Sequence, residues 1–138
     1  MKFWPFLFLL LLGCRLCAQT QLQPVAGLAT QEVYDLLIDK RGFLWVGHEL
    51  GISRFDGKNF KHFTHPQQAS LSMTDLVEDA QGRIWCHNFS GQVFYIENEK
   101  IEFYKAYDHA KEPVFPRMVI WGNELIITSV EGDRKSVV

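Results

Sequence analysis

The sequence predicts an all-β fold made of four-stranded antiparallel units of about 40 residues, and three observations lead to this prediction. The segment DKRGFLWVG at 39–47 recurs as DAQGRIWCH at 79–87, so the chain repeats itself at a fixed spacing. Each copy holds four short runs of strand-forming residues separated by turn signals, and neither copy shows a helical period. Aromatic residues make up 14% of the chain, which favours pleated, half-buried strands.

Residues 1–18 are predicted to be a leader and no part of the fold. Lys2 precedes an apolar run, FWPFLFLLLL, which is shorter than the roughly 20 residues that span a bilayer. This pattern is typical of a secretory signal peptide cleaved after Ala18. The segment LLGC leaves a second interpretation open, in which Cys14 carries a lipid. Either interpretation takes the mature chain out of the cytoplasm.

The strands of the first copy follow from its turn residues. VYDLLI ends at Asp39, and Asp at the first turn position with Gly42 at the fourth suits a type I turn. FLWVG is apolar along its length, as expected of a strand that is covered on both faces. Gly51, free to take a positive φ, turns the chain into ISRF, and Asp56-Gly57 turns it again into NFKHF.

The second and third copies repeat this plan. The matched pairs, all at the same spacing, are Asp39 and Asp79, Gly42 and Gly82, Leu44 and Ile84, Trp45 and Trp85, Gly51 and Gly91, and Phe55 and Tyr95. A third copy starts at RMVIW and continues to Gly132. Four-stranded units at this period are typical of β-propeller blades, which stack face to face. Trp45 and Trp85 are therefore expected to lie buried between neighbouring blades.

The C-terminal segment 133–138 is expected to be foreign to the protein. Asp133 to Val138 read DRKSVV, which is the translation of a common sequencing-adapter read-through, although a natural polar terminus is the alternative. We expect the natural chain to continue past Gly132 and the ring of blades to be incomplete, because a propeller closes its ring to cover strand edges. The predicted organisation is a signal peptide at 1–18, a spacer at 19–32, blades at 33–65 and 66–107, the start of a third blade at 108–132, and the foreign tail at 133–138.

The first copy resembles the two-component regulator propeller repeat, whose pattern runs roughly V-x-x-I/L-x-x-D-x-x-G-x-I/L-W-I/V-G-T-x-x-G-I/L-x-x-F/Y-D-G. The residues that match are Val33, Asp39, Gly42, Leu44, Trp45, Val46, Gly47, Gly51, Ile52, Phe55, Asp56 and Gly57. The sequence departs from the pattern at His48, where the family has Thr, and at Cys86-His87-Asn88, where the family has I/V-G-T.

The resemblance implies a function in signalling. Such repeats form the periplasmic sensor regions of membrane histidine kinases, so the chain is expected to be an extracytoplasmic ligand-sensing module. The expected ligand is small, for example a glycan fragment, and membrane attachment is expected only through a later part of the protein. Whether the intact protein forms a dimer is left open by the sequence. The alternatives are a secreted propeller enzyme of the lyase kind and a non-catalytic interaction scaffold.

Few residues are candidates for a site. His48 aligns with Asn88 and Ser129, so the same rim of each blade presents a polar group, and ligand sites gather on such loops. The interpretation that we favour is turn chemistry, because these positions just precede a turn. His62 and His65 form at best a weak metal pair, and no metal or cofactor is predicted.

Composition and motifs argue against other functions. The net charge of −2 gives no basic surface, so nucleic acid is not an expected partner. No nucleophile with a neighbouring base and no phosphate-binding loop is found in the sequence. Asp39 and Asp79 are explained by their turns, and Cys86, the one cysteine left after cleavage at Ala18, is expected to be a small buried hydrophobe.

Overall fold

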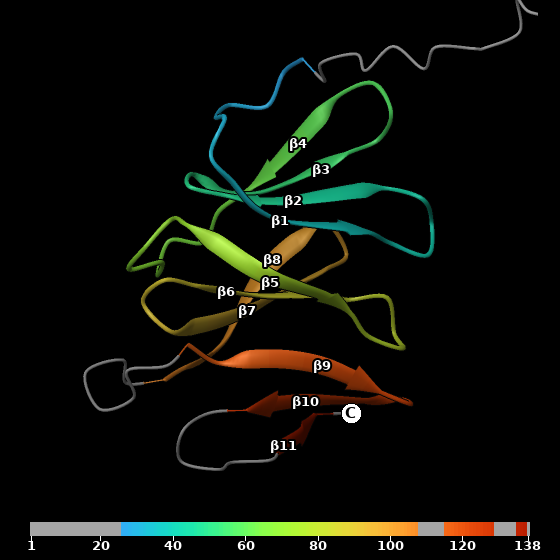
Figure 1. The fold of residues 1–138 in the computed structure, drawn as a ribbon, viewed down its shortest axis with the longest axis vertical. Coiled ribbons are helices and arrows are strands. Elements are labelled where there is room, and N and C mark those ends of the chain that lie inside the picture. Colours follow the sequence, from blue (N-terminus) through green and yellow to red (C-terminus); the bar gives the residue numbers. More distant parts are fainter. Residues whose placement is uncertain (1–25, 108–114, 129–134, 138) are drawn as a thin grey trace, which may run out of the picture.

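The computed structural model describes residues 26–107, 115–128 and 135–137, and their regular structure is β-strand throughout (Figure 1). The strands are β1 (Val33–Ile38), β2 (Leu44–His48), β3 (Gly51–Phe55), β4 (Phe60–Phe63), β5 (Met73–Glu78), β6 (Ile84–Asn88), β7 (Gln92–Glu97), β8 (Lys100–Ala106), β9 (Arg117–Trp121), β10 (Glu124–Thr128) and β11 (Lys135–Val137). The predicted leader with Cys14 and Ala18, and also Ser129 and Gly132, lie outside the described residues. Within the described ranges no helix has the length and hydrophobicity that crossing a membrane requires.

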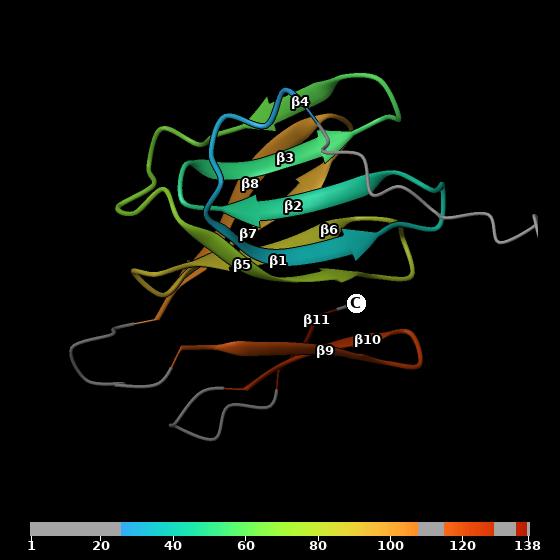
Figure 2. The ribbon, with the colours of Figure 1, turned by 45° about the horizontal axis from the view of Figure 1, so that its top comes forward.

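The strands form three antiparallel sheets that follow one another along the chain. β1 to β4 form the first blade and β5 to β8 the second, each in sequence order, while β9, β10 and β11 form a third sheet with β10 in the middle. Figures 1 and 2 show the three sheets stacked in series. The strands predicted for the first two copies have ends close to those observed, and the prediction of all-β propeller blades is confirmed.

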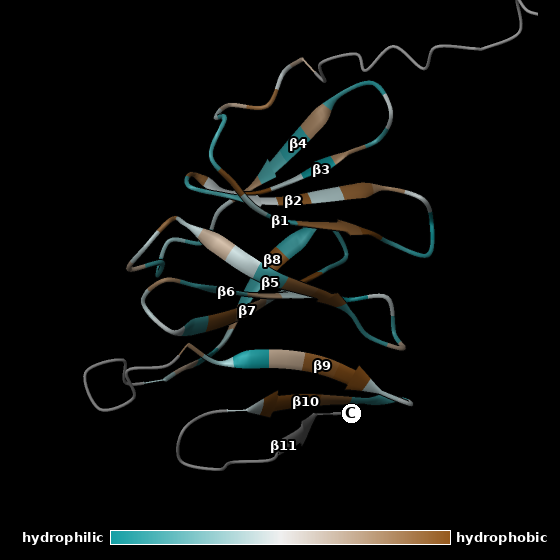
Figure 3. Ribbon diagram, in the orientation of Figure 1, coloured by the Kyte–Doolittle hydropathy of each residue, from teal (hydrophilic) through white to brown (hydrophobic). Residues whose placement is uncertain are grey.

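Two apolar clusters hold the sheets together. The first lies between the first and second blades and consists of Trp45, Ile52, Phe63, Met73, Leu76, Ile84, Cys86, Phe94, Ile96 and Ile101. The second lies between the second blade and the third sheet and consists of Trp85, Val93, Tyr107, Met118, Leu125 and Ile127. Figure 3 shows the apolar stretches of β7, β9 and β10 where these last two sheets meet. Trp45 and Trp85 are each 1% exposed, which confirms their predicted burial between blades.

The described sheets do not close into a ring, and the outer faces of the stack are apolar. Leu37 packs into the first cluster, so Leu36 and Ile38 on the same strand point the other way. These two side chains are 59% and 70% exposed. At the other end, Val119 and Trp121 of β9 are 52% and 76% exposed. The expectation of an incomplete ring agrees with these open sheet faces.

Candidate functional site

The repeated Asp and Trp form a hydrogen-bonded turn in the first blade. The Gly42 N–H donates to the Asp39 carbonyl over 2.8 Å, and Gly42 has a φ of 84°, a conformation that favours glycine. Asp39 Oδ1 accepts the N–H groups of Arg41 and Phe43 over 3.0 and 2.9 Å. Asp39 Oδ2 accepts the indole Nε1–H of Trp45 over 2.9 Å. One carboxylate therefore shapes the turn and fixes the Trp that packs against the next blade.

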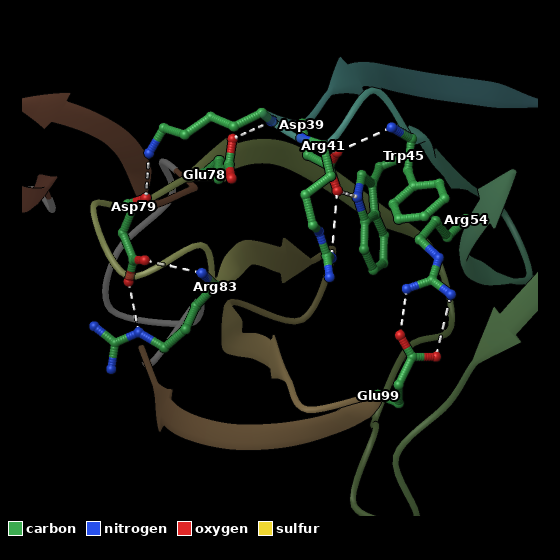
Figure 4. Close-up of polar contacts among 10 residues, drawn as sticks. Asp39, Arg41, Trp45, Arg54, Glu78, Asp79, Arg83 and Glu99 are labelled. Atoms are coloured by element: carbon green, nitrogen blue, oxygen red, sulfur yellow. Dashed lines mark hydrogen bonds and ion pairs between the residues drawn. The ribbon is translucent and has the colours of Figure 1, made fainter. Parts of the chain in front are cut away.

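The second blade repeats this arrangement with one change. Asp79 Oδ1 accepts the N–H groups of Gln81 and Arg83, both over 2.9 Å, and Asp79 Oδ2 accepts the Trp85 indole over 2.8 Å. Gly82 again has a positive φ, of 80°. Arg83 adds an ion pair from its Nε to Asp79 Oδ2 at 2.5 Å (Figure 4). The first blade has Phe43 at this position, so this ion pair is specific to the second blade.

Both turn carboxylates are held in the ionised form. Burial by itself would raise the pKa of Asp39 and of Asp79, but the indole and backbone N–H donors outweigh burial and lower each pKa below its usual value. An ionised carboxylate that accepts this many hydrogen bonds has no proton to donate. The geometry therefore matches the turn role that the sequence predicted for both residues.

His48 and Asn88 are buried and take part in the turns that follow them. His48 is 0% exposed, and its Nδ1 accepts the Leu50 N–H over 3.2 Å. Asn88 is also 0% exposed, and its Oδ1 accepts the N–H groups of Ser90 and Gln92 over 3.0 and 2.9 Å. Its Nδ2 donates to the Ser70 carbonyl over 2.9 Å. The two side chains therefore serve their turns, and the aligned Ser129 lies outside the described residues.

A chain of hydrogen bonds in the first blade joins His48, Ser53 and His62, which the sequence did not indicate. His48 Nε2 lies 2.8 Å from Ser53 Oγ, and Ser53 Oγ lies 3.1 Å from His62 Nδ1. Because the Leu50 N–H donates to His48 Nδ1, the His48 proton sits on Nε2 and is donated to Ser53. Ser53 then donates to His62. Ser53 is only 2% exposed, so its hydroxyl is not open to a substrate.

His62 and His65, which the sequence offered as a weak metal pair, have different partners in the structure. His62 belongs to the chain just described, whereas His65 packs its ring against Phe94 and Phe103 of the second blade at 5.6 and 6.5 Å between centroids. No three His, Cys, Asp or Glu side chains among the described residues are grouped as metal ligands would be.

Carboxylates of the first strands connect one blade to the next. Asp35 Oδ2 of β1 accepts the Leu76 N–H of β5 over 2.7 Å. Asp75 Oδ2 of β5 accepts the Met118 N–H of β9 over 2.6 Å in the same way. Asp35 and Asp75 both lie at register shifts in their strands, and Asp75 has a positive φ of 57°. The bulges thus turn each carboxylate towards the neighbouring blade.

Charged side chains also bridge the first seam, which is the junction between the first and second blades (Figure 4). Glu99, in the turn between β7 and β8, forms ion pairs with Arg54 and with Lys61, the latter at 2.6 Å. The Arg54 and Lys61 hydrogen bonds lower the pKa of Glu99 to about 2. Lys40 donates its backbone N–H to Glu78 and its Nζ to the Asp79 carbonyl, both over 2.9 Å.

A cavity of about 320 Å³ opens between the two blades at this seam. Hereafter it is called the interblade cleft. Its lining residues are Arg41, Trp45 and Arg54 of the first blade and Gln81, Gly82, Ile84, Ile96, Glu97, Asn98 and Glu99 of the second. Its polar groups thus come from turns and strands of both blades, and its apolar groups from the buried strands. A hollow of this composition can hold a small polar molecule.

The fold and the repeats together define a β-propeller repeat protein. Residues 27–49, which contain the first part of the repeat motif, match the family described as two component regulator propeller. This segment is therefore similar to the repeat of that family, in agreement with the resemblance seen in the sequence. A stretch of 51 residues is 39% identical to Histidine kinase P4 from Formosa agariphila. It covers 37% of this chain but only 4% of that protein, so the chain spans a small part of its relative's length.

Two solved structures have a similar fold. Selenomethionine-substituted virginiamycin B lyase from Staphylococcus aureus is 20% identical, with a TM-score of 0.60 over 75% of this chain and 40% of the lyase. A catalytically inactive form of that lyase with quinupristin is also 20% identical, with a TM-score of 0.61 over 79% of this chain and 42% of the lyase. At this level of identity the likeness shows the propeller fold alone.

Proposed function

We propose that this chain belongs to the ligand-sensing region of an exported two-component signalling protein and carries no catalytic step itself. The observation that carries the proposal is the match of residues 27–49 to the two-component regulator propeller family. The stretch that is 39% identical to a histidine kinase supports the same assignment. Because the stretch covers only a small share of that relative, the rest of the relative is long enough to contain an output region.

The geometry supports a binding role better than an enzymatic one. Asp39 and Asp79 are ionised turn residues, and Ser53, which has histidine neighbours, is buried. The first seam and the second seam, which is the junction between the second blade and the third sheet, are both built from contacts between sheets. A ligand that bridges two sheets could change how they pack. Polar lining from both blades at the interblade cleft suits such a ligand. A small hydroxyl-rich molecule, for example a glycan fragment, is the ligand class that we propose.

The genomic locus tests this proposal. We expect the reading frame to continue past the codon of Gly132 into further repeats of about 40 residues, the period of propeller blades. A membrane-spanning segment of about 20 apolar residues and a kinase region with a phosphoacceptor His should follow. A stop codon soon after the last blade, with no kinase in the frame, would instead favour a secreted scaffold or enzyme.

Export is tested separately. Residues 1–18, fused to a reporter that is active only outside the cytoplasm, should direct its export. Removal of the apolar run from the same fusion should abolish reporter activity, because that run is the feature that the secretion machinery recognises. Retained activity without the run, or none with it, would contradict the exported location.

A further inference from the structure

The interblade cleft contains polar groups that the fold does not use. Gln81 and Asn98 line the cleft, and their side-chain amides take part in none of the hydrogen bonds found within the described part of the chain. The Nε of Arg54 is buried and has no hydrogen-bond partner there either. Buried polar groups are normally satisfied, so the Arg54 Nε calls for an explanation, whereas Gln81 and Asn98 are exposed. Donors and acceptors from both blades are thus available to a molecule in the cleft.

Arg41 supplies a positive charge at the mouth of the cleft. Its side chain is 58% exposed, and its Nη2 reaches Asp39 Oδ2 only at 3.5 Å. Asp39 already accepts three shorter hydrogen bonds, from two backbone N–H groups and from Trp45. Arg54 differs, because its two Nη groups are held by Glu99. Most of the donors of Arg41 therefore remain free for an anion.

The repeat itself does not require Arg41. The second blade forms the same Asp turn with Gln81 at the equivalent position. In both blades the turn uses the backbone N–H of this residue, and the side chain of Arg41 adds only its 3.5 Å contact with Asp39. The guanidinium at 41 is therefore a feature of this seam, and a change from Arg to Gln keeps a residue that the turn is known to accept.

We propose that the interblade cleft binds a small organic carboxylate that also carries hydroxyl groups. The guanidinium of Arg41 would pair with the carboxylate, because a planar guanidinium donates two parallel hydrogen bonds to that group. The amides of Gln81 and Asn98 would bond to the hydroxyls, and the volume of about 320 Å³ suits a single sugar-sized molecule. This inference rests on the proposed sensing function and names its ligand chemistry and site.

Calorimetric titration of the full-length chain with sodium D-glucuronate tests the inference, and D-glucose is the matched neutral probe. We expect saturable binding of glucuronate and much weaker binding of glucose. Arg41→Gln should weaken glucuronate binding about tenfold or more, since a hydrogen bond to a charged group is lost. Arg117→Gln is the matched control, because Arg117 is 76% exposed on the third sheet, away from the cleft, and this variant should bind normally.

Nuclear magnetic resonance of the same samples locates the binding. Glucuronate should shift the indole N–H signal of Trp45, which lines the cleft, and leave that of the exposed Trp121 in place. No saturable binding, equal binding of glucose, or full affinity in Arg41→Gln would each overturn the proposed site. The genomic test is independent of this result. If the reading frame encodes a kinase but the chain does not bind glucuronate, the proposed sensing function stands. Only the proposed binding site in the cleft would then be wrong.

Discussion

The first and second blades share their turns but differ at the seams where they meet the next sheet. At the first seam, a Cβ added to Gly47 would lie 2.6 Å from the Met73 carbonyl oxygen, so only glycine allows this approach. The equivalent residue at the second seam is His87, which is 2% exposed. Its ring stacks on Phe115 with a centroid distance of 5.8 Å and an interplanar angle of 13°.

This difference shows which parts of the repeat are constrained by the blade itself. The bonds that the Asp carboxylate makes to the turn N–H groups and to the Trp indole recur in both blades, and each of these bonds lies within one blade. Gly47 and His87 touch the next sheet, so their identity depends on what that sheet presents. Where one backbone closely approaches another, as at Gly47, only glycine fits. Where the next sheet presents an aromatic ring, as at His87, the flat imidazole ring can stack on it. Each seam therefore has its own chemistry, and variants of the two blades can separate these roles.

The largest effect is expected from the two buried tryptophans. Trp45→Ala should lower the free energy of unfolding by about 3–5 kcal/mol, the range for large-to-small changes in a core. Trp85→Ala should fall at the low end of this range, because its cluster includes fewer buried residues than that of Trp45. Urea denaturation of the two variants measures both values. A loss below about 0.5 kcal/mol, which is typical of surface positions, would contradict burial between the blades.

The next largest effect is expected from closing the space at the first seam. Gly47→Ala should cost about 1–3 kcal/mol, because the new methyl group must push the second blade away from the first. Gly57→Asn is a control, since Gly57 has a positive φ of 93° but open space around its Cβ position. That change should cost less than about 1 kcal/mol, as Asn tolerates positive φ. Equal losses in the two variants would show that the close approach at Gly47 is unimportant.

An effect of similar size is expected from the buried turn side chains. Asn88→Ala should cost about 1–3 kcal/mol, because it leaves buried N–H groups of the turn without an acceptor. His48→Asn places the side chain of the second blade in the first and should cost less, since Asn can accept the same turn N–H. Thermal unfolding compares the two. A greater loss for His48→Asn would mean that the bond from His48 to Ser53 matters more than the turn.

The smallest effect is expected from acid, and the groups that cause it differ between the seams. Burial lowers the pKa of His87 below the usual 6.5, so the unfolded chain takes up a proton more readily than the folded one. Stability of the second seam should therefore be complete above pH 6.5 and decline as the pH falls below it. The pKa of Glu99 at the first seam is lowered from 4.5 to about 2, so its contribution should be lost only between these values.

Hydrogen exchange, expressed as protection factors, measures this difference. Between about pH 7 and pH 5, a range that spans the usual titration of histidine, the amides of β9 and β10 should lose protection because of His87. The amides of β2 should lose protection as well, because burial also lowers the pKa of His48 at the end of that strand. His87→Gln should remove the pH dependence of the second seam. Glu99→Gln should lower stability at neutral pH only slightly, because Glu99 is 46% exposed and water screens its ion pairs. Protection of β9 and β10 that still falls with pH in His87→Gln would contradict the assignment to His87.

Much of the blade structure was predicted from the sequence because its signals are local. Strand ends follow from turn residues a few positions away, and the Asp turn closes between Asp39 and Phe43. The pairing of Ser53 with His62 was missed, because a two-residue turn at Asp56-Gly57 would place Ser53 opposite Phe60. The observed turn runs from Asp56 to Asn59, with the Asp56 N–H donating to the Asn59 carbonyl, and this sets Ser53 opposite His62. Residues directly opposite on one face of a sheet are neighbours.

By itself, the sequence determined the repeat, the strands, the turns and the burial of Trp45 and Trp85. Only the tertiary structure decided which groups meet across a seam. Arg54 pairs with Glu99 of the next blade, and Arg41 shares a cleft with Asn98. No local pattern encodes these contacts, because they depend on how far and at what angle one blade docks on the next. That geometry results from the packing of whole sheet faces, in which every side chain at the seam takes part.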